Sequence, residues 1–470
     1  MRSRVLSGVA LSLGLAMLSS KARAECARPT DAGGAAGYAY GAAPVKTVDG
    51  ARVRVHYTLE GTSAVRATPA RPSGVPEDVA RVQEVADDAM TRYEAKGFRA
   101  PLADNTGSCT EFGGDAKLDI YLVKFGGGDG QTVPESCKSA GKAKVCTSFL
   151  LVESKLGARY ASAEEGIRTV VPHELFHAIQ NAYDANLDGF FSEGSAQWAT
   201  SSLYPELKDL SRFLPSFFKE PERSLDVASG GVTSGYLYGA AIWSVFLAER
   251  FGEDMPKKVL EAHAASGGPT LSVTDTVLAD QGGLASAFGE FGAWNVGTGS
   301  RAGQGGYAQR ASYPLVPVLS ATDDAPIDGV LSGLSTRYYS ISLSGRRRVA
   351  LVGDSQRISV RFVPSVDGKA NVSGAKVLPA DFEGDGFLVV STQNTKKSDA
   401  PYQITFQDAP ADGPGPDAGA AADAGTAAPG AAPGDDGGCA VAHGPSPATG
   451  LALLAPALGL LALRRSRRRR

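Results

Sequence analysis

Hydrophobic and polar residues follow two different periods in the first part of the chain. Strict alternation of apolar and polar positions predicts half-buried strands at 53–59 and 118–122, and a short apolar run predicts a further strand at 149–152. Apolar residues recur every third or fourth position over 76–97 and 162–184, which predicts two amphipathic helices. This order of elements indicates a small sheet followed by a helix that packs against it.

The pattern changes in the second half of the chain. Residues 193–299 are expected to be mainly helical, whereas 309–407 contain short alternating runs broken by Gly and Asp. These runs lie at 339–343, 358–362 and 402–406. They predict a β-sandwich of about a hundred residues. Because this segment contains no His and no Cys, we expect no chemistry in it. The expected fold class is therefore α+β.

The two ends of the chain have compositions that differ from a folded core. Residues 1–24 begin with arginines, continue with an apolar run and end in Ala-Arg-Ala, which predicts a secretory signal peptide cut after Ala24. Residues 408–438 consist almost entirely of Asp, Ala, Pro and Gly, and predict a disordered linker. An apolar stretch and six arginines follow within 439–470. The first folded domain is thus expected at 25–308.

Charge supports this division. The 470 residues carry a net charge of −3, and the two end segments, 1–24 and 439–470, carry four and six positive charges without any acidic residue. The part between them therefore has a net charge of −13. An acidic protein is a poor candidate for binding nucleic acid or anionic membrane surfaces. We expect no nucleic-acid partner, and membrane contact only through the C-terminal tail.

The strongest chemical signal is His173-Glu174-Leu175-Phe176-His177, an H-E-x-x-H motif on the second predicted helix. Residues four apart lie on one face of a helix, so both imidazoles can bind one Zn²⁺. Glu174 points about a quarter-turn away, where a general base would meet a water molecule. Two ordinary helix histidines are the plainer alternative. The chain has only five histidines, however, and the apolar stripe of the helix fits the motif.

A third metal ligand is available downstream. Glu193 follows His177 by sixteen positions, in the sequence F-F-S-E-G-S-A-Q-W. The metzincin pattern would require Gly at position 180 and His at position 183, but the chain has Gln180 and Tyr183. The metzincin alternative is therefore excluded.

An H-E-x-x-H motif followed by E-G-x-A resembles the gluzincin metallopeptidases, the thermolysin and zinc-aminopeptidase group. The resemblance implies that His173, His177 and Glu193 are zinc ligands and that Glu174 is the general base. From about residue 53 to residue 299 the chain is also similar to H-E-x-x-H metallopeptidases of myxobacteria. In a gluzincin-like unit the predicted strand at 149–152 is expected to be the sheet edge that pairs with an extended peptide.

The resemblance also suggests roles for residues around the metal. Tyr236 fits the aminopeptidase pattern Y-x-x-G, in which the Tyr donates a hydrogen bond to the tetrahedral oxyanion, and Tyr238 is the alternative. Core packing is the plainer role for either tyrosine. Thermolysin-like enzymes have Asp four residues after the ligand Glu, whereas this chain has Gln197. Gln197, Asp184 and Asp188 are the candidates for orienting a ligating His.

Asp184-x-Asn186-x-Asp188-Gly189 matches the first half of a calcium-binding loop. The closing Glu would fall at position 195, which is Ser195. A Ca²⁺ site is therefore a weaker expectation than Zn²⁺, and a polar turn that leads to the third ligand is the plainer interpretation.

Four cysteines remain when Cys439 in the tail is set aside: Cys26, Cys109, Cys137 and Cys146. In an exported chain they predict two disulfides, for which three connectivities exist. The preferred pairs are Cys137 with Cys146, which closes a small loop, and Cys26 with Cys109. Zinc binding by these cysteines is less favoured because none forms a C-x-x-C pair.

The order of Cys439, an apolar segment and an arginine cluster resembles the myxobacterial C-terminal sorting tail (MYXO-CTERM). The resemblance implies processing near Cys439 by a sorting machinery and display on the outer surface. Residues 447–463 are barely enough to span a bilayer, and a plain single-pass anchor is the alternative. We expect a mature protein that begins at Glu25, ends near Cys439, and is secreted or held at the cell surface.

Taken together, the motifs predict an exported zinc-dependent peptidase that acts on a peptide or protein substrate. The alternative, from another class, is a cell-surface binding or adhesion protein whose sandwich binds the partner and whose metal site is vestigial. An intact Glu174 between the two histidines favours catalysis.

Overall fold

The computed structural model describes residues 26–106, 109, 115–227, 235–393, 395 and 398–410. They belong, up to Ala409, to one compact unit. The expected signal peptide, most of the linker and the tail that includes Cys439 lie outside the described residues. Within the described ranges, no helix is both long and apolar enough to cross a membrane.

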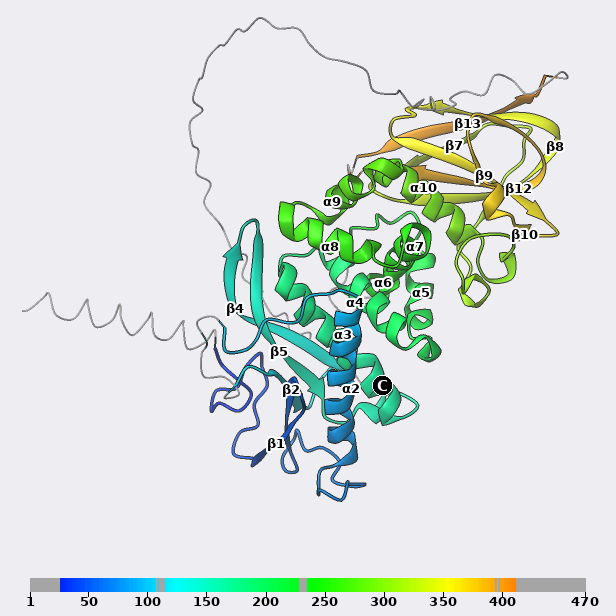
Figure 1. Cartoon of the computed structure of the whole chain (residues 1–470). Helices are drawn as coiled ribbons and strands as arrows, with labels where there is room; N and C mark the ends of the chain where they lie inside the picture. The colour runs from blue at the N-terminus through cyan, green and yellow to red at the C-terminus, as the bar shows by residue number, and fades with distance from the viewer. Residues whose placement is uncertain are drawn as a thin grey trace, which may run out of the picture. The chain divides into compact units, whose positions relative to one another are not determined.

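A five-stranded sheet has the strand order β1-β2-β3-β5-β4 (Figure 1). Its strands are β1 (Val45–Asp49), β2 (Val53–Thr58), β3 (Leu118–Val123), β4 (Gly130–Ala140) and β5 (Ala143–Glu153). β2, β3 and β5 run parallel to one another, while β1 and β4 pair antiparallel with β2 and β5. The three strands expected from alternation and the apolar run correspond to β2, β3 and part of β5.

The edge of this sheet differs from the expectation. β5, which contains residues 149–152, lies inside the sheet between β3 and β4, and β4 is the edge strand. Almost every position of β5 is buried, whereas β4 is largely exposed and contains Pro134. A proline is tolerated at a sheet edge because no ladder hydrogen bond is lost there. β4 is therefore the edge strand on this side of the sheet, and β1 is the edge strand on the other side.

Helices follow the sheet, with short 3₁₀ turns between some of them. They are α2 (Glu77–Ala95), α3 (Ala163–Tyr183), α4 (Gly189–Leu203), α5 (Leu210–Phe218), α6 (Gly235–Gly239), α7 (Ala241–Phe251), α8 (Met255–Ser266), α9 (Thr270–Val277) and α10 (Gly283–Val296). The H-E-x-x-H helix is α3, and it packs against α2, β5 and α4. Its first turn is capped by Ser162, whose Oγ accepts the Glu165 backbone N–H at 3.0 Å.

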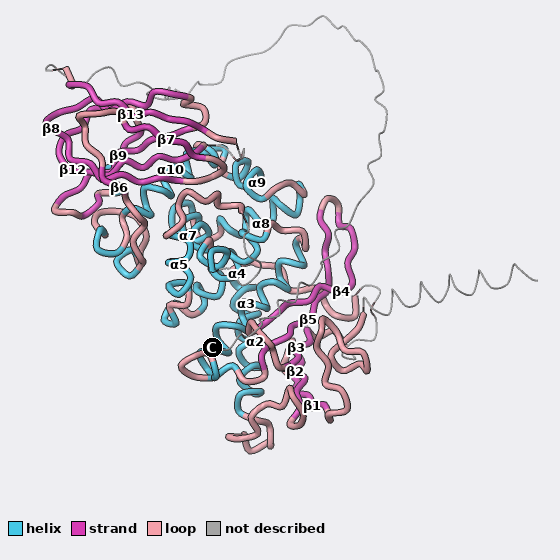
Figure 2. Tube along the Cα trace, turned by 180° about the vertical axis from the view of Figure 1, so that it is seen from behind, coloured by secondary structure: helices cyan, strands magenta, loops and turns pink. Residues whose placement is uncertain are grey.

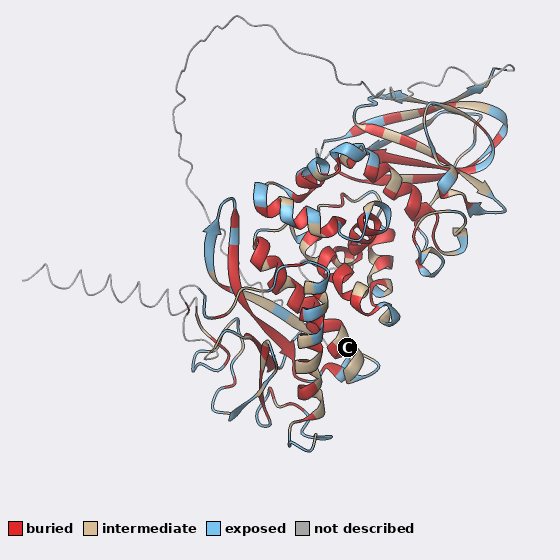
Figure 3. Ribbon diagram, viewed as in Figure 1, coloured by how far each residue is buried: buried red, intermediate tan, exposed pale blue. Residues whose placement is uncertain are grey.

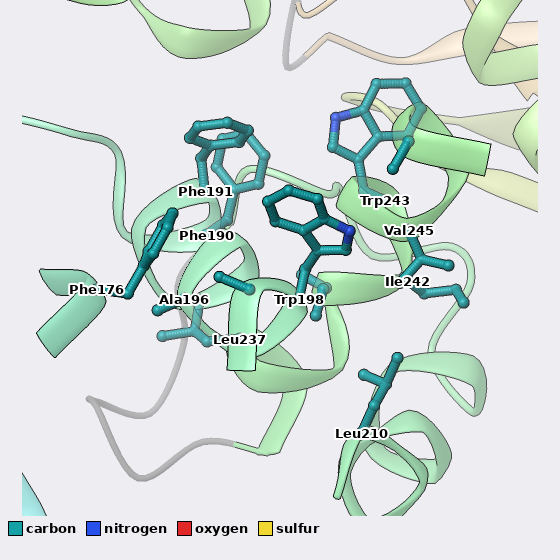
Figure 4. Close-up of a cluster of buried hydrophobic side chains, with 14 of the residues drawn as sticks. Phe176, Phe190, Phe191, Ala196, Trp198, Leu210, Leu237, Ile242, Trp243 and Val245 are labelled. Atoms are coloured by element: carbon teal, nitrogen blue, oxygen red, sulfur yellow. The ribbon is translucent and has the colours of Figure 1, made fainter. Parts of the chain in front are cut away.

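The helical part has a core rich in aromatic side chains (Figure 4). The figure labels Phe176, Phe190, Phe191, Ala196, Trp198, Leu210, Leu237, Ile242, Trp243 and Val245. They come from α3, α4, α5, α6 and α7, so one core fixes the positions of all the helices around the motif. α7 is buried along most of its length (Figure 3).

The chain ends in a larger sheet, called here the C-terminal sheet (Figure 2). Its strands are β6 (Leu319–Ser320), β7 (Ile327–Leu331), β8 (Thr336–Gly353), β9 (Ile358–Val366), β10 (Lys369–Ala370), β11 (Lys376–Val377), β12 (Ala380–Thr392) and β13 (Ala400–Asp408). Pairing is antiparallel except between β6 and β8. The fold is thus mixed α and β, as expected. α10 packs closely on this sheet: a Cβ added at Gly292 would lie 2.8 Å from Val389 Cγ1.

Candidate metal centre

Two neighbouring helices supply the candidate donor atoms. His173 and His177 lie one turn apart on α3, and their Nε2 atoms are 3.1 Å apart. Glu193, near the start of α4, has its Oε2 atom 3.2 Å from His173 Nε2 and 3.4 Å from His177 Nε2. Among the described residues, these three form the one group of His, Cys, Asp or Glu side chains close enough to hold an ion together.

These separations fit a tetrahedral ion. Bonds of about 2.0–2.1 Å at tetrahedral angles place the ligand atoms about 3.3–3.4 Å apart. The lone pairs of two neutral imidazoles at 3.1 Å repel one another unless a cation or a proton lies between them. Two imidazoles and one carboxylate are also a donor set of known catalytic zinc sites. The residues present therefore fit Zn²⁺.

His177 is oriented by Gln180, a residue that the sequence motif uses only to exclude a metzincin. The Nδ1–H of His177 donates to Gln180 Oε1 at 2.7 Å. The amide of Gln180 is fixed in turn, because its Nε2 donates to Ser192 O and Ser195 Oγ. This bond turns Nε2 of His177 toward the other donor atoms. Fixing the orientation of a ligating His is the usual role of such an outer partner.

Charge and burial shift the pKa values of the donor group. Burial is the largest influence on His177 and lowers its pKa, but Glu193, with smaller contributions from Glu174 and Gln180, raises the pKa overall to about 9. Burial would raise the pKa of Glu193, yet the facing His177 and His173 hold it well below its usual range. In the metal-free protein at neutral pH, His177 is thus a cation paired with the Glu193 carboxylate.

Zinc binding at pH 7 is expected to release about one proton, because the metal must displace the proton that His177 holds below its pKa of about 9. The apparent zinc affinity should therefore rise about tenfold per pH unit as the pH increases toward 9, and level off above it. Calorimetry in buffers with different ionisation enthalpies measures the released proton. A zinc affinity that stays constant from pH 6 to pH 8 would contradict the pairing of His177 with Glu193.

Glu174 lies beside the donor group. The Thr132 hydroxyl on β4 lies 2.7 Å from the backbone oxygen of Glu174 and 2.9 Å from its Oε2 atom. The edge strand therefore holds both the main chain and the carboxylate of Glu174. Burial raises the pKa of Glu174, and the nearby His177 and His173 lower it in part. A raised pKa makes a carboxylate a better proton acceptor.

The structure does not bring Tyr236 to the donor group. Its side chain is 2% exposed, and its hydroxyl lies 3.1 Å from Arg223 O and 3.2 Å from Ser224 O, to which it donates. Residues two apart on a helix point about 200° away from each other, so Tyr236 and Tyr238 cannot both face the cleft. The expectation that Tyr236 contacts the reacting group is therefore corrected.

Tyr238 lines the cleft and lies nearer the donor group. Its ring centroid is 5.7 Å from that of His173. Burial, and after it the charges of Glu193 and Glu174, raise the pKa of Tyr238. A tyrosine hydroxyl keeps its proton at neutral pH even without such a rise, so that of Tyr238 is available as a hydrogen-bond donor in the cleft.

The three candidates for orienting a ligating His have other partners. Gln197 donates through Nε2 to Asp209 Oδ2 at 2.7 Å. Asp184 accepts a backbone N–H from β5, and Asp188 accepts one from α9. These carboxylates therefore tie the turn between α3 and α4 to neighbouring elements, while Gln180 orients His177. A Ca²⁺ site at this turn stays a prediction.

Two disulfides are present, between Cys26 and Cys109 and between Cys137 and Cys146. They are the pairs preferred from the sequence. The first closes a loop with a sequence separation of 83 and ties the start of the described chain to the region before β3. The second joins β4 to β5, so it fastens the edge strand that carries Thr132. Disulfides are typical of proteins in oxidising compartments.

The donor group opens into a cleft of about 770 Å³. Its walls come from β4, α3, α4, α5 and α6, and from the chain before β1. The aromatic residues that line it are Tyr38, Phe125, Tyr160, Phe213 and Tyr238. Polar and apolar groups contribute about equally to its lining, and a concave cleft of this size is typical of a ligand-binding site.

Comparison with known proteins adds little to this geometry. No family model and no curated protein matches the chain. One similar solved structure is the pre-peptidase C-terminal domain of a collagenase from Bacillus anthracis, with 10% identity, a TM-score of 0.14, and coverage of 19% of this chain and 95% of that chain. Two others are the periplasmic lysozyme inhibitors PliG.

The PliG of Salmonella Typhimurium has 15% identity and a TM-score of 0.15, and the match covers 19% of this chain and 98% of that chain. The PliG of Aeromonas hydrophila has the same identity, TM-score and share of this chain, with 97% of its own length covered. Likenesses this weak carry no conclusion about function.

Proposed function

We propose that the protein is an exported zinc-dependent peptidase of the gluzincin type. The observation that supports it is the close grouping of His173, His177 and Glu193 donor atoms, with the Glu174 carboxylate beside them in a cleft. The three donors would hold Zn²⁺. Zn²⁺ bound there would polarise a peptide carbonyl and lower the pKa of a water molecule.

The protein's own residues would carry the proton transfer. Glu174 accepts a proton from the attacking water and passes it to the leaving amine. Thr132 holds the Glu174 carboxylate in place on the edge strand. Tyr238 donates a hydrogen bond to the oxygen of the scissile carbonyl as negative charge develops on it.

The substrate would be a peptide or an extended protein segment. β4 forms one edge of the five-stranded sheet and one wall of the cleft, and an edge strand can pair with an added strand. In this proposal the catalytic unit is gluzincin-like and the C-terminal sheet is a β-sandwich. The two disulfides support export.

A peptide-library assay tests the proposal directly. The mature protein, loaded with one zinc ion, should cleave peptide bonds in members of the library, and the metal-free protein should cleave none. Zinc binding without cleavage of any library member would favour the alternative, a surface binding or adhesion protein with a vestigial metal site.

Gly130→Ala is expected to lower turnover about a hundredfold while zinc affinity stays unchanged. A Cβ atom at this position would lie 2.6 Å from both Cγ and Oε1 of Glu174, so the general base would have to move. The matched control is Gly127→Ala in the preceding loop, where an added Cβ meets no atom within 4 Å. Measured kcat values that are equal for the Gly130 and Gly127 variants would count against the placement of Glu174.

A further inference from the structure

The short helix α6, which carries Tyr238, is held on the side that faces away from the cleft. Its residue Tyr236 donates a hydrogen bond to the carbonyl groups of Arg223 and Ser224. The Arg223 guanidinium also stacks on the Tyr236 ring, 3.8 Å from the centroid. Tyr236 thus ties α6 to residues 221–225, which are called the anchor segment below.

The anchor segment is bonded in turn to the C-terminal sheet. Leu225 N–H donates to Leu334 O at 2.9 Å, and Leu334 N–H donates to Ser224 Oγ at 2.9 Å. Thr336, the first residue of β8, donates its N–H to Pro221 O at 2.8 Å. Three hydrogen bonds from the main chain around the start of β8 therefore fix the segment that Tyr236 contacts.

A surface ion pair adds to this connection. Both the Nε and the Nη2 atoms of Arg337 on β8 donate to the Glu222 carboxylate, at 2.7 and 2.6 Å. An exposed pair of this kind contributes little to stability by itself. The hydrogen bonds of the buried residues Ser224 and Leu334 are therefore the stronger part of the contact.

On its other sides α6 is wedged between two helices of the site. A Cβ atom at Gly239 would lie 2.7 Å from Phe213 O on α5, and a Cβ atom at Gly194 on α4 would lie 3.3 Å from the main chain of Ala240. Phe213 also lies against the Tyr238 ring, with centroids 4.9 Å apart. α4 carries Glu193, so both neighbours of α6 belong to the cleft wall.

A helix of five residues has almost no stability of its own, because nucleation costs more than so few hydrogen bonds return. Its position therefore depends on its anchors. We propose that Tyr236 is a positioning residue for Tyr238, and that the C-terminal sheet thereby takes part in forming the peptidase site. The expected effect on catalysis rests on the proposed function. The structural claim, that Tyr236 holds α6 in place, can be tested without any measurement of turnover.

Hydrogen–deuterium exchange tests the structural part. Tyr236→Phe removes only the hydroxyl, and the amides of residues 235–240 should then exchange about fivefold to tenfold faster. Tyr40→Phe is the matched control, because it removes another buried tyrosine hydroxyl that donates to two main-chain oxygens, those of His56 on β2 and Leu122 on β3, each at 2.9 Å. Unchanged exchange of residues 235–240 in Tyr236→Phe would overturn the inference whether or not the protein is a peptidase.

A double-mutant cycle on peptide cleavage tests the catalytic part. If Tyr236 acts through Tyr238, Tyr236→Phe should lower kcat with zinc affinity unchanged, and the double variant should be no slower than Tyr238→Phe alone. If the fold-losses in kcat of the two single variants multiplied in the double variant, Tyr236 would not act through Tyr238. A wild-type protein that binds zinc and cleaves nothing would refute the proposed function, and the exchange experiment would still decide the role of Tyr236.

Discussion

Replacing Glu174 by Gln is expected to lower the turnover of a peptide substrate by about 10²–10⁴-fold while zinc stays bound. Gln has nearly the same shape, and its amide can still bond to Thr132, but it cannot accept a proton. The three donor side chains are untouched by this change. Steady-state kinetics on a peptide from the library, together with the zinc content of the purified variant, measure both parts of the expectation.

Glu164→Gln is the matched control for this variant. Glu164 lies on the same helix, and its partly exposed carboxylate pairs with Arg81 at 2.6 Å, away from the cleft. It should keep the activity of the wild type. If Glu174→Gln lost zinc as completely as a ligand variant, Glu174 would be a ligand rather than the base.

Glu193→Ala is expected to weaken zinc binding by more than the 10–100-fold that is typical of losing an outer partner of a ligand. The substitution removes one of three donors and the only negative charge among them. It should also lower the pKa of His177 in the metal-free protein. Burial lowers this pKa, and the substitution removes the Glu193 carboxylate that raises it. Competition with a zinc chelator measures the first effect, and NMR titration of the imidazole measures the second.

The matched control is Glu206→Ala, which removes an exposed carboxylate that pairs with Arg168 on α3. Its zinc affinity should equal that of the wild type, since exposed ion pairs contribute little. A Glu193→Ala protein that binds zinc as tightly as this control would remove Glu193 from the donor group.

The part of the site that depends on local spacing could be predicted from the sequence. His173 and His177 meet because a helix brings residues four apart onto one face. Glu193 joins them because the turn between α3 and α4 has only five residues, which returns the chain beside the helix that it has just left. Gln180 is also local to His177, three positions away, so the same reasoning could have found it.

The remaining features depend on contacts that local spacing does not specify. Thr132 lies 42 positions before Glu174, and only the strand order of the sheet brings them together. The choice between Tyr236 and Tyr238 depends on which way a five-residue helix is turned, and that is set by its anchors. The resemblance to a gluzincin unit predicts the sheet edge at 149–152, but nothing in the local pattern indicates that β4 covers that strand.

The disulfide between Cys26 and Cys109 encloses β1, β2 and α2. A single cut anywhere in this enclosed stretch leaves two pieces that remain covalently joined. In the chain-entropy description, closing a loop of this length also stabilises the fold by roughly 4–5 kcal/mol. Molecules nicked in this stretch by another protease, or by the proposed peptidase activity itself, would therefore stay joined and would separate on a gel only after reduction.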